Sequence, residues 1–289
     1  MHVLYTMTLI YLFSFGEGKI EDISISEPQS ISIDMTGNLY LADTNNNRII
    51  KFDAESEPVK VVGGFGWEKE EFDYPLDVNA KSGLDIFVAD YNNSRIERYD
   101  KDLNYISSYY SNESLAENLQ FDYPSGVAIS IHGEIVLIDT ENERLLKINS
   151  FGQPEISFGD YSEGMGRLDN PAQVEIGAKD RIYVSDQNGA VVVVYDYFGN
   201  YLTNIGEGLL KRPYGIAIDA SNCIWVADRD EKAVFAFGSN GDLLLRHCAA
   251  ETESHDIIDP KDIAIFRNRA YVLDGNRIHV YEIIQNHLE

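Results

Sequence analysis

An internal repeat runs through the sequence and sets its fold class. Six prolines head the repeat units at intervals of 42 to 49 residues: Pro28, Pro75, Pro124, Pro171, Pro213 and Pro260. An aspartate follows 15 residues after each of the first five prolines and 14 residues after the last: Asp43, Asp90, Asp139, Asp186, Asp228 and Asp274. A repeat of this length indicates one supersecondary unit that is copied six times and packed against its own neighbours.

The pattern inside each unit is that of short antiparallel strands. In the first unit, apolar residues alternate in runs at 31–34, 39–43, 48–53 and 59–62, with turn residues between them. A period of two is typical of strands, and no long stretch shows the helical period. Four such strands form one propeller blade, so the sequence predicts an all-β fold. We expect a single six-bladed β-propeller domain over residues 1–289, with four-stranded antiparallel blades.

The ring needs one more strand, because the sixth unit supplies only three, around 263–265, 270–274 and 277–283. The segment 13–16 precedes Pro28 by the same 12 residues that separate the similar segment 156–159 from Pro171. We therefore predict that residues 8–15 form the outer strand of the last blade and close the ring. The alternative is that residues 1–16 are an export signal, against which stand the lack of Lys or Arg near Met1 and of a small-residue cleavage site. An exported or cell-envelope location of the bacterial type and a cytoplasmic one both stay open.

Composition excludes several classes of partner. The chain has 23 Lys and Arg against 48 Asp and Glu, a net charge of −25, which repels phosphate backbones and anionic lipid surfaces. We therefore expect no nucleic acid, no membrane insertion and a monomeric chain. Cys223 and Cys248 are predicted to lie two strands apart, about 9.5 Å, which is too far for a disulfide.

Three segments carry a family resemblance: LADTNNNRIIKFD at 41–53, VADYNNSRIERYD at 88–100 and LIDTENERLLKIN at 137–149. They resemble NHL repeats, the units of six-bladed NHL-type propellers. Units four to six lose the Asn-Asn pair, and the last one is shortened. Some NHL-like propellers are lyases or hydrolases with a central metal held by histidines, but here no three histidines occupy equivalent inner positions. The RING and B-box modules and the RNA binding of some animal members do not carry over either, because zinc-ligand cysteines are absent and the charge has the wrong sign.

Two positions in each repeat have a structural interpretation. Three residues before each aspartate stands a bulky residue that we expect to pack between neighbouring blades: Tyr40, Phe87, Val136, Tyr183, Trp225 and Tyr271. In the first three units an arginine follows the aspartate by five residues, and a hairpin of that length should pair the two charges. In units four and five Val191 and Ala233 replace it, so Asp186 and Asp228 are predicted to be solvated, paired with another group such as Lys232, or open to a cation or basic ligand.

The turns that follow the aspartates and the loops that carry the prolines should share one face of the ring, where propellers of this kind bind ligands. The predicted ligand-binding residues on this face are Tyr74, Tyr91, Asn92, Asn93, Tyr123, Glu141, Asp186, Gln187, Asn188, Tyr214, Asp228, Arg229 and Asp230. Aromatic, amide and carboxylate groups in this mixture favour a protein, peptide or carbohydrate ligand. For Tyr74 and Tyr123, packing beneath their own loops is the alternative.

The sequence therefore favours a binding or scaffold propeller over an enzyme, with no catalytic residue and no metal ligand assigned. The alternative is a metal-assisted lyase or hydrolase with its centre near Asp186 and Asp228. No cofactor is predicted, although inner carboxylate and amide oxygens leave a calcium ion open, because such sites have little sequence signature. Capture of a basic peptide by the acidic face is a third interpretation.

Overall fold

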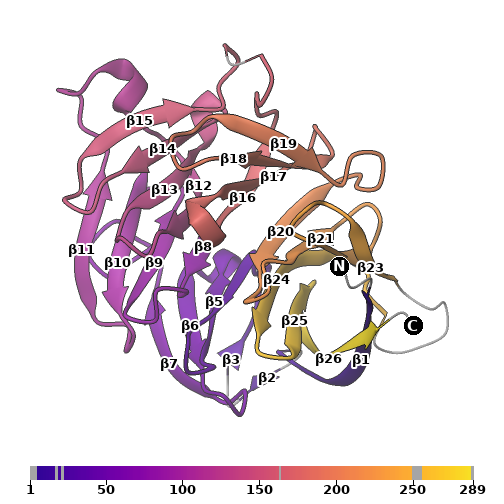
Figure 1. The fold of residues 1–289 in the computed structure, drawn as a ribbon. Helices are drawn as coiled ribbons and strands as arrows, with labels where there is room; N and C mark the ends of the chain where they lie inside the picture. Colours follow the sequence, from indigo (N-terminus) through magenta and orange to yellow (C-terminus); the bar gives the residue numbers. More distant parts are fainter. Residues whose placement is uncertain (1–4, 17–18, 21–22, 163, 249–255, 288–289) are drawn as a thin grey trace.

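The computed structural model describes residues 5–16, 19–20, 23–162, 164–248 and 256–287. Their strands form a closed ring of six four-stranded antiparallel sheets around a central axis (Figure 1). The six-bladed propeller predicted from the repeat is confirmed, and each proline stands at or just before the first strand of a blade.

Each of the first three blades runs in chain order from the axis outward. Blade 1 contains β4 (Ser30–Ile33), β5 (Leu39–Asp43), β6 (Arg48–Phe52) and β7 (Pro58–Gly63). Blade 2 contains β8 (Pro75–Asn79), β9 (Asp85–Asp90), β10 (Arg95–Asp100) and β11 (Tyr105–Tyr110). Blade 3 contains β12 (Pro124–Ile129), β13 (Ile135–Asp139), β14 (Arg144–Ile148) and β15 (Pro154–Phe158).

The last three blades follow the same order, except that the outer strand of blade 6 comes from the start of the chain. Blade 4 contains β16 (Pro171–Ile176), β17 (Ile182–Asp186), β18 (Val191–Tyr195) and β19 (Tyr201–Ile205). Blade 5 contains β20 (Pro213–Ile218), β21 (Ile224–Asp228), β22 (Ala233–Phe237) and β23 (Leu243–Cys248). Blade 6 contains β24 (Pro260–Phe266), β25 (Arg269–Asp274), β26 (Arg277–His287) and β1 (Tyr5–Phe15).

The ring is closed by β1, which pairs antiparallel with β26 and brings the two ends of the chain together. Met7 and Leu9 on one side of β1 are buried, whereas Ile10 on the other side is 50% exposed. The predicted closing strand is thus confirmed, and it begins three residues earlier than expected. The reason is that β26 extends to His287 and offers a partner to Tyr5. Residues 1–4 of the segment considered as an export signal lie outside the described residues.

The core consists of six apolar clusters, and each joins two neighbouring blades. The bulky residue three positions before each aspartate belongs to a different cluster in every blade, which confirms its role in packing between blades. Trp225, for example, is fully buried among residues of blades 5 and 6. Stability is therefore distributed around the ring rather than concentrated in one centre.

Only short elements interrupt the blades within the described residues. A small hairpin of β2 (Lys19–Ile20) and β3 (Ile23–Ser24) precedes blade 1. Single 3-10 turns lie at η1 (Thr44–Asn46), η2 (Glu117–Leu119), η3 (Thr140–Asn142) and η4 (Ala178–Asp180). No helix in this part of the chain is long and apolar enough to cross a membrane. Cys223 is buried and Cys248 exposed, and both are free thiols as predicted.

Candidate ligand-binding face

Six aspartates build one face of the ring by joining two kinds of loop. Each stands at the end of the second strand and accepts a backbone N–H from the loop that leads to the proline of the same blade. In blade 1 the N–H of Ser26 lies 2.7 Å from Oδ1 of Asp43, and in blade 5 the N–H of Lys211 lies 2.7 Å from Oδ2 of Asp228. The equivalent bonds in blades 2, 3, 4 and 6 are 2.9, 3.1, 2.7 and 3.0 Å long. The loops therefore share one surface, as predicted, and we call this surface the ligand-binding face.

In the first three blades, the arginine five residues after the aspartate reinforces the link between the turn and the proline loop. Its Nε lies 2.7 Å from the aspartate in blades 1 and 2 and 2.8 Å in blade 3, which confirms the three predicted pairs. The guanidinium also donates to backbone oxygens of the proline loop, as from Arg95 to the carbonyl of Glu71 at 2.6 Å. One arginine thus fixes a carboxylate and a loop at once.

Backbone donors replace the missing arginine in blades 4 and 5. Asp186 accepts the N–H groups of Asp169 and Gly189, and Asp228 accepts those of Lys211, Arg212, Asp230 and Glu231. Both carboxylates are almost fully buried. Burial raises the pKa of Asp186 to about 6, although the two backbone N–H groups oppose the shift. The expectation of solvation or of a Lys232 partner is wrong for both, because backbone N–H groups of the proline loop and of the following turn supply their hydrogen bonds.

Three predicted tyrosines meet over blades 2 and 3. The ring centroid of Tyr91 lies 6.4 Å from that of Tyr74 and 5.3 Å from that of Tyr123. Tyr74 is 38% exposed and Tyr123 is 37% exposed, so the rings pack against one another and still present area to solvent. Burial is the main cause of the raised pKa of Tyr91, and the neighbouring Tyr123 and Glu141 raise it further. We call these three residues the tyrosine rail.

A groove of about 490 Å³ lies beside the tyrosine rail, between blades 2 and 3. Its acidic lining residues are Glu113, Glu117, Asp122 and Glu141. No ion pair links any of the four to a cation in the described part of the chain. Asp122 accepts hydrogen bonds from the hydroxyl of Ser94 and from the N–H of Tyr123. We call this feature the acidic groove.

The predicted amides of blade 2 are braces for the loops rather than free ligand groups. Asn92 donates to Asp73 at 2.9 Å, and Asn93 donates to the carbonyl of Gly66 at 2.9 Å and to Asp90 at 2.8 Å. In blade 4, Asn188 donates to Asp169 at 3.2 Å, and Gln187 accepts from Arg212 at 3.1 Å.

The remaining predicted residues lie on the other side of the face, toward blades 5 and 6. Tyr214 donates to Gln29 at 3.2 Å, and burial raises its pKa to about 12. The guanidinium of Arg229 lies 5.3 Å from the Tyr214 ring and pairs with Asp259 at 2.9 Å. Asp230 is exposed beside them. The structure therefore separates the predicted site residues into the tyrosine rail with Glu141 and a second group around Tyr214.

Sequence reasoning missed a polar belt across the axis of the ring. Asp77, Gln173 and Asp262 project from the first strands of blades 2, 4 and 6, and all three are at most 9% exposed. The Nε2 of Gln173 lies 3.3 Å from Oδ1 of Asp77 and 3.0 Å from Oδ2 of Asp262. We call these three residues the axial belt.

Each member of the axial belt also accepts a backbone N–H from the next blade. The N–H of Val127 lies 2.8 Å from Asp77, that of Ile216 lies 2.6 Å from Gln173, and that of Ile31 lies 2.7 Å from Asp262. The residue two positions after the proline is small in the blades that donate these N–H groups: Ser30, Gly126 and Gly215. A Cβ added at Gly215 would lie 2.3 Å from the Cα of Asp262, so only glycine fits there. The alternation of large polar and small residues two positions after each proline is the sequence signal for this belt.

Metal ligands do not gather anywhere in the described residues, where no three His, Cys, Asp or Glu side chains form a group that could hold an ion. His279 is buried and bonded to Ser14 at 2.8 Å, while His132 lies on the opposite face.

The closed ring of six four-stranded sheets is a six-bladed β-propeller, and the axial belt and the shared loop face are parts of it. The chain resembles solved propellers over nearly its whole length. It matches a streptogramin B lyase with a TM-score of 0.65 at 14% identity, covering 99% of this chain and 88% of that one. A protein from Bacteroides thetaiotaomicron gives a TM-score of 0.72 at 12% identity, covering 97% and 76%. At these identities the likeness concerns the fold alone.

Sequence comparison identifies the kind of repeat. No family model matches the chain. Human NHL repeat-containing protein 3 is 24% identical over 198 residues, which are 65% of this chain and 55% of that protein. The Drosophila melanogaster protein brain tumor is 27% identical over 127 residues, 43% of this chain and 12% of that protein. A probable peptidyl-alpha-hydroxyglycine alpha-amidating lyase of Caenorhabditis elegans is 27% identical over 124 residues, 41% and 35%. The chain spans less than two thirds of the length of each of these relatives. Together with the repeat motifs and the fold, these matches make the chain an NHL-repeat propeller.

Proposed function

We propose that the chain is a non-catalytic binding propeller that takes a protein or peptide segment on its ligand-binding face. The tyrosine rail and the acidic groove form its centre, and the segment that they fit carries Lys or Arg side chains. The observation that carries the proposal is the position of an exposed tyrosine cluster beside a groove whose four acids form no ion pair with a cation among the described residues.

The chemistry of the two features is complementary. Tyrosine rings supply contact area at small cost in conformational entropy, and their faces attract guanidinium and ammonium groups. Carboxylates without an internal partner gain most when a cation arrives from outside, because nothing has to be displaced. The joints made by Asp90 and Asp139 hold this part of the face rigid before binding, which reduces the ordering cost.

A carbohydrate would use the tyrosine rail without needing the acids. Sugar hydroxyl groups bind amides and carboxylates by hydrogen bonds, so their binding depends weakly on salt, whereas cationic peptides lose affinity as salt screens the groove. The salt dependence of binding therefore separates the two ligand classes.

The metal-assisted lyase or hydrolase is the second candidate, and its support is the fold-level likeness to lyases. Its centre near Asp186 and Asp228 has little chemical basis, because both carboxylates are buried acceptors of backbone N–H groups. A thermal melt with EDTA and then with added Ca²⁺ or Zn²⁺ tests it. A midpoint that falls with EDTA and returns with one metal would favour the enzyme; an unchanged midpoint removes the candidate.

The proposed function is tested by fluorescence anisotropy with a labelled peptide of alternating Arg and Tyr, beside a matched peptide with Gln in place of Arg. We expect binding of the Arg peptide only, weakened by salt. The paired variants Glu117→Gln/Glu141→Gln and Tyr91→Ala/Tyr123→Ala should each weaken it by about tenfold or more. The control variant is Phe198→Ala, which removes another exposed aromatic side chain, 67% exposed and in the turn between β18 and β19, away from the groove. Equal binding by the control and the site variants would contradict the proposal.

A further inference from the structure

The face opposite the ligand-binding face carries the turns between the first and second strands of the blades. In three adjacent blades an apolar side chain stands in this turn: Met35 is 74% exposed, Leu84 is 74% exposed and Ile131 is 91% exposed. Met35 and the turn of blade 2 are in contact, since a Cβ added at Gly83 would lie 2.8 Å from the Met35 sulfur. Exposed apolar groups that recur at one turn of neighbouring blades mark an interaction surface rather than scattered surface residues.

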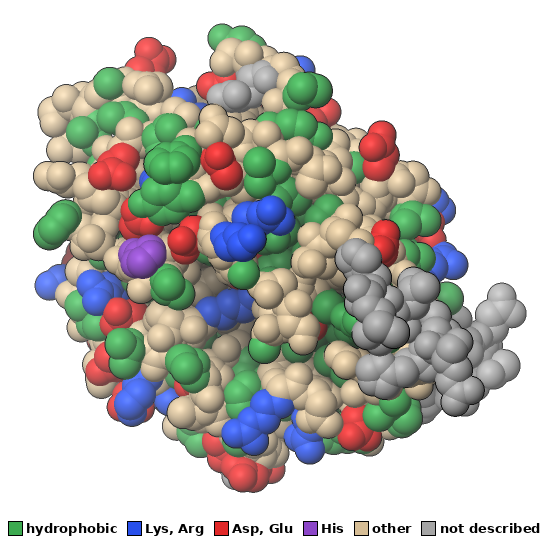
Figure 2. Space-filling view, in the orientation of Figure 1, with side chains coloured by type: hydrophobic (Ala, Val, Ile, Leu, Met, Phe, Trp, Pro, Cys, Tyr) green, Lys and Arg blue, Asp and Glu red, His purple; other side chains and the backbone are tan. Residues whose placement is uncertain are grey.

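Cations occupy the same turn in other blades. Lys179 and Arg267 are exposed, Arg181 is half-buried, and none of the three forms an ion pair within the residues that the structure describes. Arg267 borders a cleft of about 330 Å³ together with Ser221, Asn268 and Gln285. Figure 2 shows Lys and Arg side chains beside and inside a hollow at the centre of the ring. The apolar turns belong to blades 1 to 3 and these cations to blades 4 and 6, so the two groups face each other across the axis.

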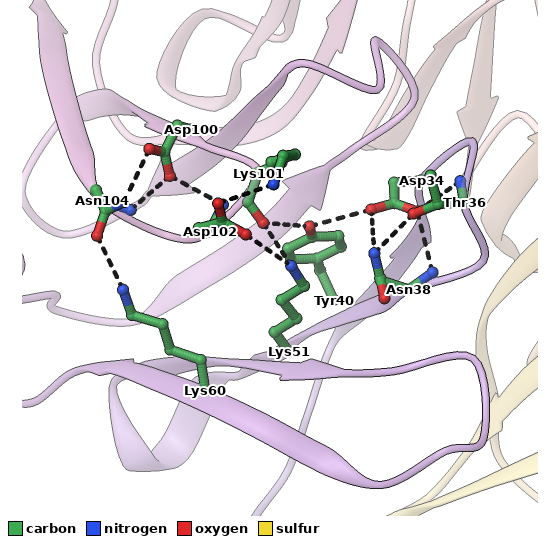
Figure 3. A network of polar contacts seen from close by, with 10 residues as sticks. All are labelled: Asp34, Thr36, Asn38, Tyr40, Lys51, Lys60, Asp100, Lys101, Asp102 and Asn104. Carbon is green, nitrogen blue, oxygen red and sulfur yellow. Dashed lines mark hydrogen bonds and ion pairs between the residues drawn. The ribbon is translucent and has the colours of Figure 1, made fainter.

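Two acids of these turns, Asp34 and Asp219, are held by hydrogen bonds within their own turns, whereas Asp180 of blade 4 is half-buried and lies 3.9 Å from His132 of blade 3. Asp34 accepts hydrogen bonds from Thr36 and Asn38 and lies 3.2 Å from the hydroxyl of Tyr40 (Figure 3). Although burial opposes it, the bonds from Asn38 and Thr36 lower the pKa of Asp34 and keep it charged within its turn. Asp219 likewise accepts the N–H groups of Ser221, Cys223 and Trp225. Lys179, Arg181 and Arg267 thus give this face cations without an ion pair among the described residues, although the chain as a whole carries a net charge of −25.

An ion pair between two inner strands lies at the centre of this face. Lys81 of blade 2 pairs with Glu175 of blade 4 across the axis at 2.8 Å, and the axial belt lies beyond them. A partner would thus rest on the turns rather than pass into the ring. We call the set Met35, Leu84, Ile131, Lys179, Arg181 and Arg267 the axial mouth.

We propose that the axial mouth docks a polypeptide segment that carries both carboxylates and large apolar side chains. An apolar arc opposite a cationic arc matches an amphipathic acidic segment, whose apolar side lies on blades 1 to 3 and whose carboxylates reach Lys179, Arg181 and Arg267. This surface is separate from the ligand-binding face, so the propeller joins a basic segment on one face to an acidic one on the other. An anionic lipid surface fits less well, since the remainder of so acidic a chain is repelled by it.

The test is fluorescence anisotropy of the full chain with a labelled peptide of alternating Glu and Leu, beside a matched peptide with Gln in place of Glu. We expect the Glu peptide to bind more tightly and to lose affinity with salt. The paired variants Lys179→Glu/Arg267→Glu and Met35→Ser/Ile131→Ser should each weaken binding by about tenfold or more. The matched controls are Lys60→Glu on β7 and Met165→Ser, which is 78% exposed outside the mouth, and both should bind as the unmodified chain does.

Three results would overturn the proposal. The first is absence of peptide binding, and the second is equal affinity in the mouth variants and their controls. The third is binding to vesicles of phosphatidylcholine and phosphatidylserine that depends on Lys179 and Arg267 while the Glu peptide does not bind, which would assign the axial mouth to a lipid surface. Circular dichroism of each variant establishes that it is folded, so loss of binding reports on the surface itself.

Discussion

The Nε2 atom of Gln173 lies 3.0 Å from the Oδ2 atom of Asp262, and this contact joins blades 4 and 6 across the axis of the ring. The Oε1 atom of the same amide accepts the N–H of Ile216 in blade 5. The same Nε2 lies 3.3 Å from Asp77 of blade 2, so this one side chain links four blades directly. Contacts of this kind are made only when the ring is closed, so they couple closure to the correct placement of every inner strand.

Replacing Gln173 by alanine should therefore cost more than the loss of one surface amide. Gln173→Ala removes one hydrogen bond from each of two buried carboxylates and leaves the buried N–H of Ile216 without its acceptor, and we expect a loss of about 1–3 kcal/mol in the free energy of unfolding. Gln153→Ala, at an exposed position, should change it by less than about 0.5 kcal/mol. Urea unfolding measures both values, and equal values would show that the axial belt adds no stability.

Two arginines on β10 should differ strongly. Arg95 is 1% exposed and pairs with Asp90 and Glu97, so Arg95→Ala leaves buried charges unpaired and should cost about 3–5 kcal/mol. Arg98 is partly exposed and pairs with Asp85 on the surface of the blade, and Arg98→Ala should cost about 0–1 kcal/mol. Chemical denaturation of the two variants provides the comparison. A cost for Arg98→Ala as large as that for Arg95→Ala would contradict the claim that burial makes the Arg95–Asp90 pair the more important of the two.

Stability should fall as the pH rises toward neutrality. Burial raises the pKa of Glu97 to about 7, against the opposing effects of Tyr99 and Arg95, and burial raises that of Asp186 to about 6. A raised pKa in the folded state favours folding below the ordinary pKa of the group, and this contribution is lost as the pH rises through the folded value. We expect a lower unfolding midpoint at about pH 8 than at about pH 5, and a weaker dependence in Glu97→Gln. An unchanged dependence in that variant would remove Glu97 as its cause.

The closing strand should tolerate change on one side only. Leu9→Ala removes a side chain that packs between blades 5 and 6 and should cost about 2–5 kcal/mol, whereas Ile10→Ala removes a half-exposed one and should cost less than about 1 kcal/mol. Thermal unfolding of the two variants measures the difference. Equal unfolding midpoints for the two variants would mean that the packing of β1 does not stabilise the closed ring.

The sequence allowed the ring, the blade order and the closing strand to be predicted, because each rests on a pattern that every repeat copies. Pro28 and Asp43 stand at the same places as their five counterparts, and the local turn fixes their roles. The shared loop face followed from the same periodicity. These features depend on short-range geometry, which a single sequence contains.

Other features depend on contacts between groups that no local pattern specifies. Asp186 seemed to lack a partner because the arginine was missing, yet its partners are backbone N–H groups, which are the same for every residue type. The axial belt joins Asp77 to Gln173, nearly a hundred residues apart, and the residues at this repeat position differ in identity. The acidic groove likewise arises where the loop around Glu117 meets the turn around Glu141, a meeting that only the folded ring brings about.

Photo-crosslinking of the labelled Arg and Tyr peptide, mapped by mass spectrometry, tests the ligand-binding face most directly. The account predicts adducts on Tyr91, on Tyr123 and in the segment 111–123, and their loss in Glu117→Gln/Glu141→Gln. Adducts spread evenly over the ring, or confined to the turns of the axial mouth, would contradict it.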